Sequence, residues 1–267
     1  MLETEEYLQI NDTRLFYTMK GDGEALVLLH GGFTDHRIWD YQVDVFAEHF
    51  KVIRYDQRGY GKSDVPVATF SNFDDLKFLI EALSLKNATI VGSSFGGGTA
   101  VDFALKYPEL LTSLILVGPG LNGYPYPSDF IQEGINVYLA AQSEGPEAAI
   151  EKFITNPFWA YFFPAPERKE ARDKVLGIVR DSKKVLAWNL MLTAMLEPFA
   201  STRLQEIHIP TLIVLSGNDN LVNIEVGEYI HQNIENSKKV FIPDCGHLPY
   251  VENPEEFNKI VIDFLMN

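Results

Sequence analysis

The chain has 267 residues, of which 46% are hydrophobic and 12% aromatic, and this is enough to bury one substantial core. Its formal charge of −15 would repel phosphate backbones and acidic lipid surfaces, and its Lys and Arg residues gather only in short pairs such as Lys183-Lys184. We therefore expect neither nucleic acid nor a membrane as a partner.

The cysteine content and the N-terminal residues bear on the cellular compartment. Cys245 is the single cysteine, which excludes an intrachain disulfide and leaves too few thiolates for a Cys-rich zinc or iron–sulfur site. Residues 1–6 are acidic where a secretory signal would be basic and then apolar, and the uncharged stretch 110–128 is interrupted by Gly and Pro at 118–120. We expect a soluble, cytoplasmic protein.

Short apolar runs alternate with helical patterns along most of the chain. Near-continuous apolar runs suit parallel strands that are buried on both faces. The predicted strands cover residues 25–30, 51–56, 88–92, 111–117 and 211–216. Helical patterns at 73–83, where Ser71 and Asp74 fit a capping box, and at 96–107, which ends at Pro108, lie between strands. The alternation predicts an α/β fold with a doubly wound, mostly parallel sheet flanked by helices.

The alternation lapses between residues 121 and 207, where no strand pattern is found. Helical patterns there cover residues 130–142, 147–154, 169–180 and 185–196. We therefore predict a core formed by residues 1–120 and 208–267, with residues 121–207 inserted as a helical cap, or lid. The aromatic cluster at 158–163 could pack within that cap or face a substrate.

A serine motif follows the third predicted strand. Residues 92–96, Gly-Ser-Ser-Phe-Gly, match the pattern G-x-S-x-G between a strand and a glycine-rich helix start. That setting is the one a nucleophile elbow requires, because a tight strand-to-helix turn exposes the serine hydroxyl in strained geometry. The motif makes Ser94, and not Ser93, the predicted nucleophile.

A glycine pair after the first predicted strand suggests where an oxyanion would be bound. Gly31 and Gly32 follow His30, and glycines there let main-chain amides face a pocket without obstruction. A tetrahedral intermediate needs preorganised donors, so we predict an oxyanion hole formed by the backbone N–H groups of Gly32 and Phe95, with Phe33 as the alternative to Gly32. We expect His30 itself to be structural.

The general base is expected late in the chain, in the order serine, acid, histidine. His247 lies in a loop between a predicted strand at 239–242 and a final helix at 254–266. A neutral imidazole there can accept the Ser94 proton and return it to a leaving group. His208, next to a proline before a strand, and His231, on an amphipathic helix, are weaker candidates.

An acid must orient the histidine and stabilise its protonated form. Asp219 follows the strand 211–216 in the turn Ser-Gly-Asn-Asp-Asn at residues 216–220, which is the expected position. The alternative position, after the preceding strand, reads Gly-Pro-Gly at 118–120 and offers no carboxylate. Asp244 is closer to His247 in sequence, but it is expected to serve its own turn.

These motifs together resemble the α/β-hydrolase superfamily over the whole chain outside the cap. The matching segments are His-Gly-Gly at 30–32, Tyr-Asp-Gln-Arg-Gly-Tyr-Gly-Lys-Ser-Asp at 55–64, the elbow at 92–97, the acid turn at 217–219, Gly246-His247, and Pro-Glu-Glu-Phe at 254–257. The resemblance implies a structural role for residues 56–63, in which Arg58 pairs with a carboxylate and Gly59 and Gly61 allow the turn.

Within the superfamily the chain looks most like the capped carboxylesterases and enol-lactonase-like enzymes. Epoxide hydrolases and haloalkane dehalogenases would need an aspartate at Ser94, because a carboxylate forms their alkyl-ester intermediate. Carbon–carbon bond hydrolases of ring-cleavage products are similar, but they typically have Trp where this chain has Leu248. Proline iminopeptidases would need cap carboxylates for a substrate amine, for which Glu197 is a candidate.

We expect a serine hydrolase that cleaves a small carboxylic ester or lactone through an acyl-enzyme, with no metal and no cofactor. The catalytic residues would be Ser94, Asp219 and His247. The predicted substrate-binding residues are Phe33, Trp159, Trp188, Leu221 and Leu248, whose apolar character suits an uncharged acyl compound. A carbon–carbon bond hydrolase, an aminopeptidase-like enzyme and a ligand receptor that does not turn over remain open, as does the oligomeric state.

Overall fold

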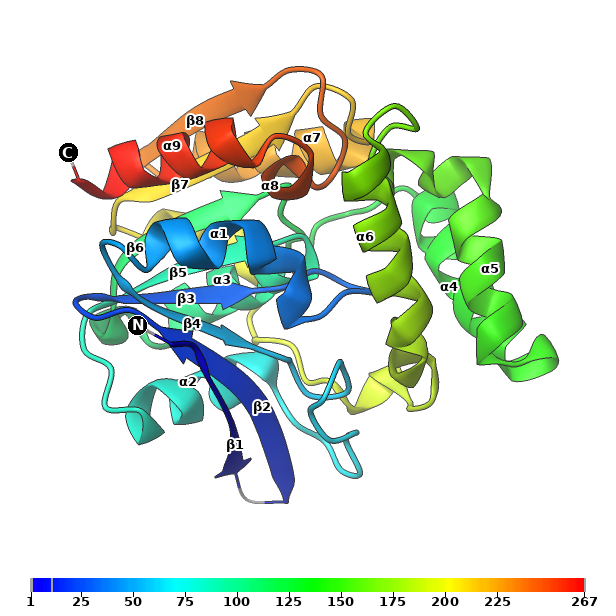
Figure 1. Ribbon diagram of the computed structural model, residues 1–267, viewed down its shortest axis with the longest axis horizontal. Coiled ribbons are helices and arrows are strands. Elements are labelled where there is room, and N and C mark those ends of the chain that lie inside the picture. The colour runs from blue at the N-terminus through cyan, green and yellow to red at the C-terminus, as the bar shows by residue number, and fades with distance from the viewer. Residues whose placement is uncertain (1, 11, 267) are drawn as a thin grey trace.

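The computed structural model describes the chain except for residues 1, 11 and 267 (Figure 1). The described residues form a sheet of eight strands in the order β1-β2-β4-β3-β5-β6-β7-β8. The strands are β1 (Thr4–Ile10), β2 (Thr13–Lys20), β3 (Ala25–Leu29), β4 (Lys51–Tyr55), β5 (Ala88–Ser93), β6 (Leu111–Val117), β7 (Thr211–Ser216) and β8 (Ser237–Ile242). Strands β3 to β8 are parallel to one another, while β2 is antiparallel to β1 and β4. The predicted mostly parallel sheet is confirmed.

The hairpin of β1 and β2 was not predicted from the sequence. Most side chains of β1 are exposed, so this strand has no apolar run of the kind that marks the central strands. It is held by backbone pairing of β2 with both β1 and β4. The hairpin therefore depends on a sheet edge that other segments provide.

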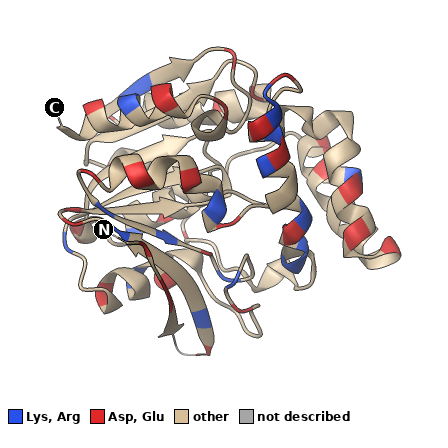
Figure 2. Ribbon diagram, viewed as in Figure 1, with Lys and Arg blue, Asp and Glu red and all other residues tan. Residues whose placement is uncertain are grey.

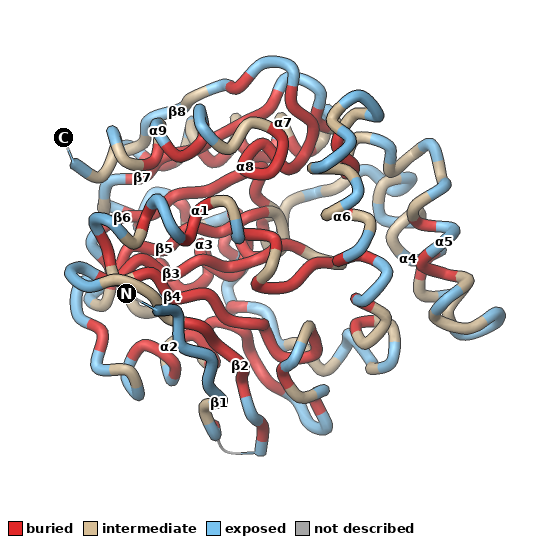
Figure 3. Tube along the Cα trace, viewed as in Figure 1, coloured by how far each residue is buried: buried red, intermediate tan, exposed pale blue. Residues whose placement is uncertain are grey.

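Helices cover both faces of the sheet. Strand β3 is buried along its length (Figure 3). Its period-2 alternation sends Leu26 and Leu28 to one face and Val27 and Leu29 to the other, and all four are fully buried. The first face packs against α1 (Asp40–Phe46), α8 (Pro249–Glu252) and α9 (Pro254–Met266). The second packs against α2 (Asn72–Ala82), α3 (Phe95–Lys106) and α7 (Leu221–Asn233). The parallel strands are thus apolar because both of their faces are covered.

The segment between β6 and β7 is helical among the described residues. It contains α4 (Ser128–Glu144), α5 (Pro146–Thr155) and α6 (Lys169–Asp181), which lie beyond the carboxyl ends of the central strands (Figure 1). We call residues 121–207 the inserted segment; the division of the chain into two domains stays a prediction. No helix of the described chain is long and apolar enough to span a membrane.

The predicted helix at 185–196 is wrong. The chain there forms two short 3-10 turns, Ser182–Leu186 and Leu190–Leu192. Backbone bonds then join it to Phe70, whose N–H donates to Leu192 O at 3.0 Å and whose carbonyl accepts from Ala194 N–H at 2.7 Å. Pairing with a distant segment thus overrides the local helical pattern.

Two side-chain predictions near α2 have different outcomes. The capping box does not form, because the Ser71 hydroxyl donates to the Asp74 carboxylate instead of closing the helix end. The predicted role of Arg58 is confirmed, since its Nε and Nη2 donate to the Asp75 carboxylate at 2.9 and 2.7 Å. Both members of this ion pair are buried.

Ion pairs connect α6 to the core. Acidic and basic residues are interspersed along this helix (Figure 2). Lys174 Nζ lies 2.6 Å from Asp40, and Arg37 Nη1 lies 3.0 Å from Asp181. Because these pairs are at least partly exposed, each contributes at most about 1 kcal/mol, so they orient the helix more than they stabilise it.

Gly61 is the tightest point of the turn that follows β4. Its φ of +44° is in the left-handed region, and an added Cβ would overlap the buried Asp56 carboxylate. That carboxylate accepts hydrogen bonds from the backbone N–H groups of His36 and Lys62 at 2.8 and 2.7 Å, so it has little room to move.

We expect Gly61→Ala to lower the free energy of unfolding by about 2–4 kcal/mol, because strain and lost hydrogen bonds add. Urea unfolding followed by circular dichroism measures this. Gly134→Ala is the matched control, because a Cβ at this position of α4 meets nothing within 4 Å. It should be neutral or stabilising by up to about 1 kcal/mol. Equal stability of the two variants would contradict the prediction.

Candidate active site

Ser94 occupies a strained turn between β5 and α3. Its φ of 51° and ψ of −116° lie outside the regions that non-glycine residues favour. The backbone holds this geometry, since Ser94 N–H donates to Val117 O at 3.0 Å and Gly120 N–H donates to Ser94 O at 2.8 Å. Gly96 makes the turn possible, because a Cβ there would stand 2.6 Å from His30 O. These features are those of a nucleophile elbow.

His247 and Asp219 are brought together by the loops after β8 and β7. His247 Nδ1 lies 2.8 Å from Asp219 Oδ2, and both side chains are buried. With its proton on Nδ1 facing the carboxylate, the imidazole keeps Nε2 available to accept a proton. Ser94 and His247 line one cavity. The structure thus assembles the three predicted residues from segments more than 20 residues apart.

Asn223 supports the acid, and the sequence reasoning missed it. Its Nδ2 donates to Asp219 Oδ1 at 2.8 Å, and the backbone N–H of Asn220 donates to the same oxygen at 2.7 Å. Asn220 also caps α7 by accepting from Val222 N–H at 2.9 Å. The available signal was the spacing, because residues four apart at a helix start share a face.

The inserted segment holds the histidine loop. His247 N–H donates to Tyr161 O at 2.9 Å, and Arg168 Nη2 donates to Asp244 O at 2.9 Å. Within the loop, Gly246 N–H donates to Glu252 Oε1 at 2.9 Å. The position of His247 therefore depends on contacts from residues 121–207 as well as on the sheet.

The cavity at Ser94, which we call the Ser94 cavity, has a volume of about 250 Å³. Aromatic side chains form most of its wall: Phe33, Tyr126, Phe130, Phe153, Trp159, Tyr161 and Phe162. Gly32 and Phe95 line it as well, and among the described residues their backbone N–H groups donate no hydrogen bond. Two unused amides beside a serine are what an oxyanion hole requires.

A second cavity, which we call the side cavity, has a volume of about 320 Å³. Gly32, Phe33 and Phe95 line both cavities, so the two adjoin at the residues predicted for the oxyanion hole. Trp188, one of the predicted substrate-binding residues, lines the side cavity. Trp159 lines the Ser94 cavity.

Two predicted substrate-binding residues lie elsewhere. Leu221 is 73% exposed at the start of α7, and Leu248 is 1% exposed in the core beside α8; neither lines these cavities. Closeness in sequence to Asp219 and His247 was misleading, because Leu221 is exposed to solvent and Leu248 packs in the core. Glu197, the candidate for binding an amine, is exposed and lines neither cavity.

His30 has structural contacts. Gln57 N–H donates to His30 Nε2 at 3.0 Å, so the proton is on Nδ1, which donates to Gly31 O at 2.8 Å. Burial lowers the pKa of this histidine, which keeps it neutral. It therefore supports the loop that carries Gly32.

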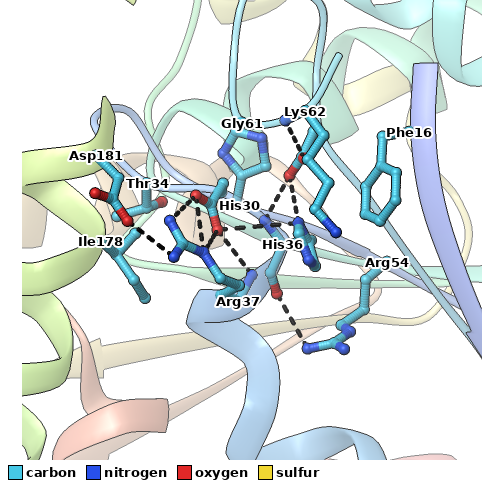
Figure 4. Close-up of polar contacts among 12 residues, drawn as sticks. Phe16, His30, Thr34, His36, Arg37, Arg54, Gly61, Lys62, Ile178 and Asp181 are labelled. Carbon is cyan, nitrogen blue, oxygen red and sulfur yellow. Dashed lines mark hydrogen bonds and ion pairs between the residues drawn. The ribbon is translucent and has the colours of Figure 1, made fainter. Parts of the chain in front are cut away.

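Asp35, His36 and Asp56 have the spacing of metal ligands. Figure 4 shows Arg37 and Lys62 close to His36, and the two aspartates accept hydrogen bonds from these neighbours. Both Asp35 oxygens accept from Arg37, and Asp56 Oδ1 accepts from His36 Nδ1 at 2.8 Å. Since these donor atoms already have protein partners, we interpret the cluster as a structural link between the loops after β3 and β4.

The chain is similar to proteins of a known family. A family model for the alpha/beta hydrolase fold matches residues 24–254. The chain belongs to this family. One relative of this α/β-hydrolase comes from Burkholderia vietnamiensis and is named 2-hydroxy-6-oxononadienedioate/2-hydroxy-6-oxononatrienedioate hydrolase. It is 33% identical over 98% of this chain and 96% of the relative.

Other members of the family are similar over the whole length. The 2-hydroxy-6-oxo-6-phenylhexa-2,4-dienoate hydrolase of Comamonas testosteroni is 30% identical over 96% of this chain and 92% of its own. Among solved structures, a thermophilic esterase from Thermogutta terrifontis matches with a TM-score of 0.79 and 25% identity, over 100% of this chain and 98% of that one. This α/β-hydrolase thus resembles enzymes that cleave different bonds.

Proposed function

We propose that this α/β-hydrolase cleaves a small carboxylic ester or lactone that carries no carboxylate, through an acyl-enzyme. The observation that carries the proposal is the placement of Ser94 and of His247, paired with Asp219, on one largely apolar cavity beside the unused amides of Gly32 and Phe95. The other residues that line the Ser94 cavity are mainly aromatic and suited to binding a substrate.

The reaction follows from this geometry. Ser94 Oγ attacks the substrate carbonyl carbon while its proton moves to His247 Nε2, and the carbonyl oxygen becomes an oxyanion held by two amides. The intermediate then expels the alcohol, which takes the proton from His247 and leaves an acyl-serine ester. Water attacks that ester, with His247 accepting its proton, and the acid is released as the Ser94 hydroxyl re-forms.

The lining residues disfavour a substrate that carries a carboxylate. No Lys or Arg of the described chain lines the Ser94 cavity or the side cavity, and the side cavity contains Asp102. A substrate carboxylate entering either cavity would lose its hydration without gaining a cation, which is costly. The net charge of −15 also repels anions from a distance.

A second candidate is carbon–carbon bond hydrolysis of a dienoate. Two relatives, which are 30% and 33% identical over nearly the whole chain, are named as hydrolases of dienoates, and this similarity favours the second candidate. The same serine, histidine and oxyanion amides would serve such a reaction. The two candidates differ in whether the site must accommodate a carboxylate.

We expect kcat/KM for p-nitrophenyl butyrate to exceed that for 2-hydroxy-6-oxo-6-phenylhexa-2,4-dienoate by about 100-fold or more, since each unpaired buried charge costs at least a few kcal/mol. Stopped-flow absorbance follows both reactions. The control pair is p-nitrophenyl butyrate against the mono-p-nitrophenyl ester of succinate, whose carboxylate should slow it about tenfold or more. Faster cleavage of the dienoate would establish the second candidate instead, and a single turnover with retained ligand would indicate a receptor.

A further inference from the structure

We propose that the side cavity is a second recognition site, in which Asp102 accepts a hydrogen bond from a hydroxyl or protonated amine of the substrate. The inference rests on the proposed function, because it concerns the part of the substrate that extends away from Ser94. Asp102 belongs neither to the proposed triad nor to the proposed oxyanion hole.

Asp102 has unused hydrogen-bonding capacity. It lies in α3, eight residues after Ser94, and is only 2% exposed. Its Oδ2 accepts from Asn122 Nδ2 at 2.5 Å, whereas its Oδ1 is buried without a hydrogen-bond partner among the described residues. Asp102 lines the side cavity. A buried carboxylate oxygen without a partner is rare in folded proteins and calls for an explanation.

The charge state suits a hydrogen-bond acceptor. Burial raises the pKa of Asp102 to about 6, against the opposing effects of Asn122, the nearby Leu196 N–H and Arg203. The group is therefore mainly ionised at pH 7.5 and incompletely solvated. A ligand O–H or N–H that reached Oδ1 would supply the missing partner, and hydrogen bonds to charged groups are among the stronger ones.

The walls of the cavity indicate the rest of the ligand. Aromatic and aliphatic side chains, such as Phe73, Tyr138 and Trp188, form most of the wall. The neutral polar residues of the lining are Asn72, Thr99, Asn122 and Thr193. Lys, Arg and His are absent from the described lining residues. The site therefore suits an apolar chain that ends in a hydrogen-bond donor, and it disfavours an acid.

The position of the cavity connects Asp102 to the reaction. Gly32, Phe33 and Phe95 line both the Ser94 cavity and the side cavity. In the proposed arrangement, the substrate carbonyl oxygen lies at the Gly32 and Phe95 amides, and one of the two arms of the substrate extends past these shared residues into the side cavity. The carboxylate that would bind this arm, Asp102, lies in α3, which packs against the sheet. Glu197, in the inserted segment, is exposed.

Two ester series test whether the acyl arm or the alcohol arm of the substrate enters the side cavity. The first series is p-nitrophenyl hexanoate with its 6-hydroxy and 6-amino derivatives, and the second is hexyl acetate with its 6-hydroxy and 6-amino derivatives. In one series, the donor-bearing ester should have a kcat/KM about tenfold or more above that of its parent at pH 7.5, chiefly through KM. No preference in either series would overturn the proposal.

Variants of Asp102 separate recognition from packing. Asp102→Leu should abolish the preference, because the acceptor for the donor group of the substrate is lost. Asp102→Asn should lose an ammonium preference and keep only part of a hydroxyl preference. The amide carries no charge, and the NH2 that replaces Oδ1 can donate to a hydroxyl oxygen but cannot accept from an ammonium. A preference that persists in Asp102→Leu would overturn the proposal.

Binding to Ser94→Ala protein keeps this test independent of hydrolysis and of the folding of Asp102 variants. Calorimetry with hexyl acetate and its two derivatives should show about tenfold or more tighter binding of a donor-bearing ester if the second series is the preferred one. The first series is titrated in the same way. Tighter binding without turnover by the wild type would reject the ester proposal and retain the side site. Turnover without any donor preference would do the reverse.

Discussion

Replacing Ser94 by Ala is expected to lower kcat for p-nitrophenyl butyrate by about 10⁴-fold or more, because the acyl-enzyme can no longer form. The residual rate would come from the oxyanion amides and from substrate binding. Initial rates measured by p-nitrophenol release determine the change. Labelling by a fluorophosphonate probe should disappear in the same variant.

Ser93→Ala provides the matched control for this result. Ser93 is the neighbouring serine at the end of β5, but its hydroxyl is buried and accepts a hydrogen bond from Tyr250 at 3.1 Å. We expect kcat to stay within about tenfold of the wild type, with labelling retained. If Ser94→Ala kept its activity while Ser93→Ala lost it, the assignment of the nucleophile would be wrong.

Asp219→Asn is expected to lower kcat by about 10⁴-fold with little change in KM, because the acid acts on the base and not on the substrate. An asparagine amide facing His247 Nδ1 would favour the tautomer with its proton on Nε2, and that tautomer cannot accept the Ser94 proton. Steady-state kinetics with p-nitrophenyl butyrate measure both constants.

Asn223→Ala is the graded comparison for the acid. It removes one of the two donors to Asp219 Oδ1 and leaves the Asn220 N–H in place. We expect a loss of about tenfold in kcat, far smaller than that of Asp219→Asn, since the carboxylate itself is retained. Full activity of Asp219→Asn would show that another group orients the histidine.

The local features of this protein could be predicted from the sequence because they depend on neighbouring residues. A strand buried on both faces must be apolar throughout, which is why β6 and β7 were predicted with the bounds that the structure has. The elbow at Ser94 needs glycines at fixed offsets, so its spacing is visible in the chain. The order of serine, acid and histidine then pointed to His247 and Asp219.

The features that failed or were missed depend on residues far apart in the chain. Hairpin β1–β2 needs the edge of β4, and the predicted helix at 185–196 gives way to backbone pairing with Phe70. Leu221 and Leu248 are close to Asp219 and His247 in sequence, yet one is exposed to solvent and the other is buried in the core, and neither lines the cavities. Sequence distance is a poor guide to which way a side chain points.

The sequence by itself determined the fold class through the alternation of strand and helix patterns, the candidate nucleophile through a short glycine-spaced motif, and the candidate base through its place in the chain order. Only the tertiary structure decided the shape of the two cavities, the support of Asp219 by Asn223, and the burial of Asp102 with an unpaired oxygen. The physical reason is that cavity walls and buried polar contacts form between elements distant in sequence. Their energies depend on packing that no local pattern records.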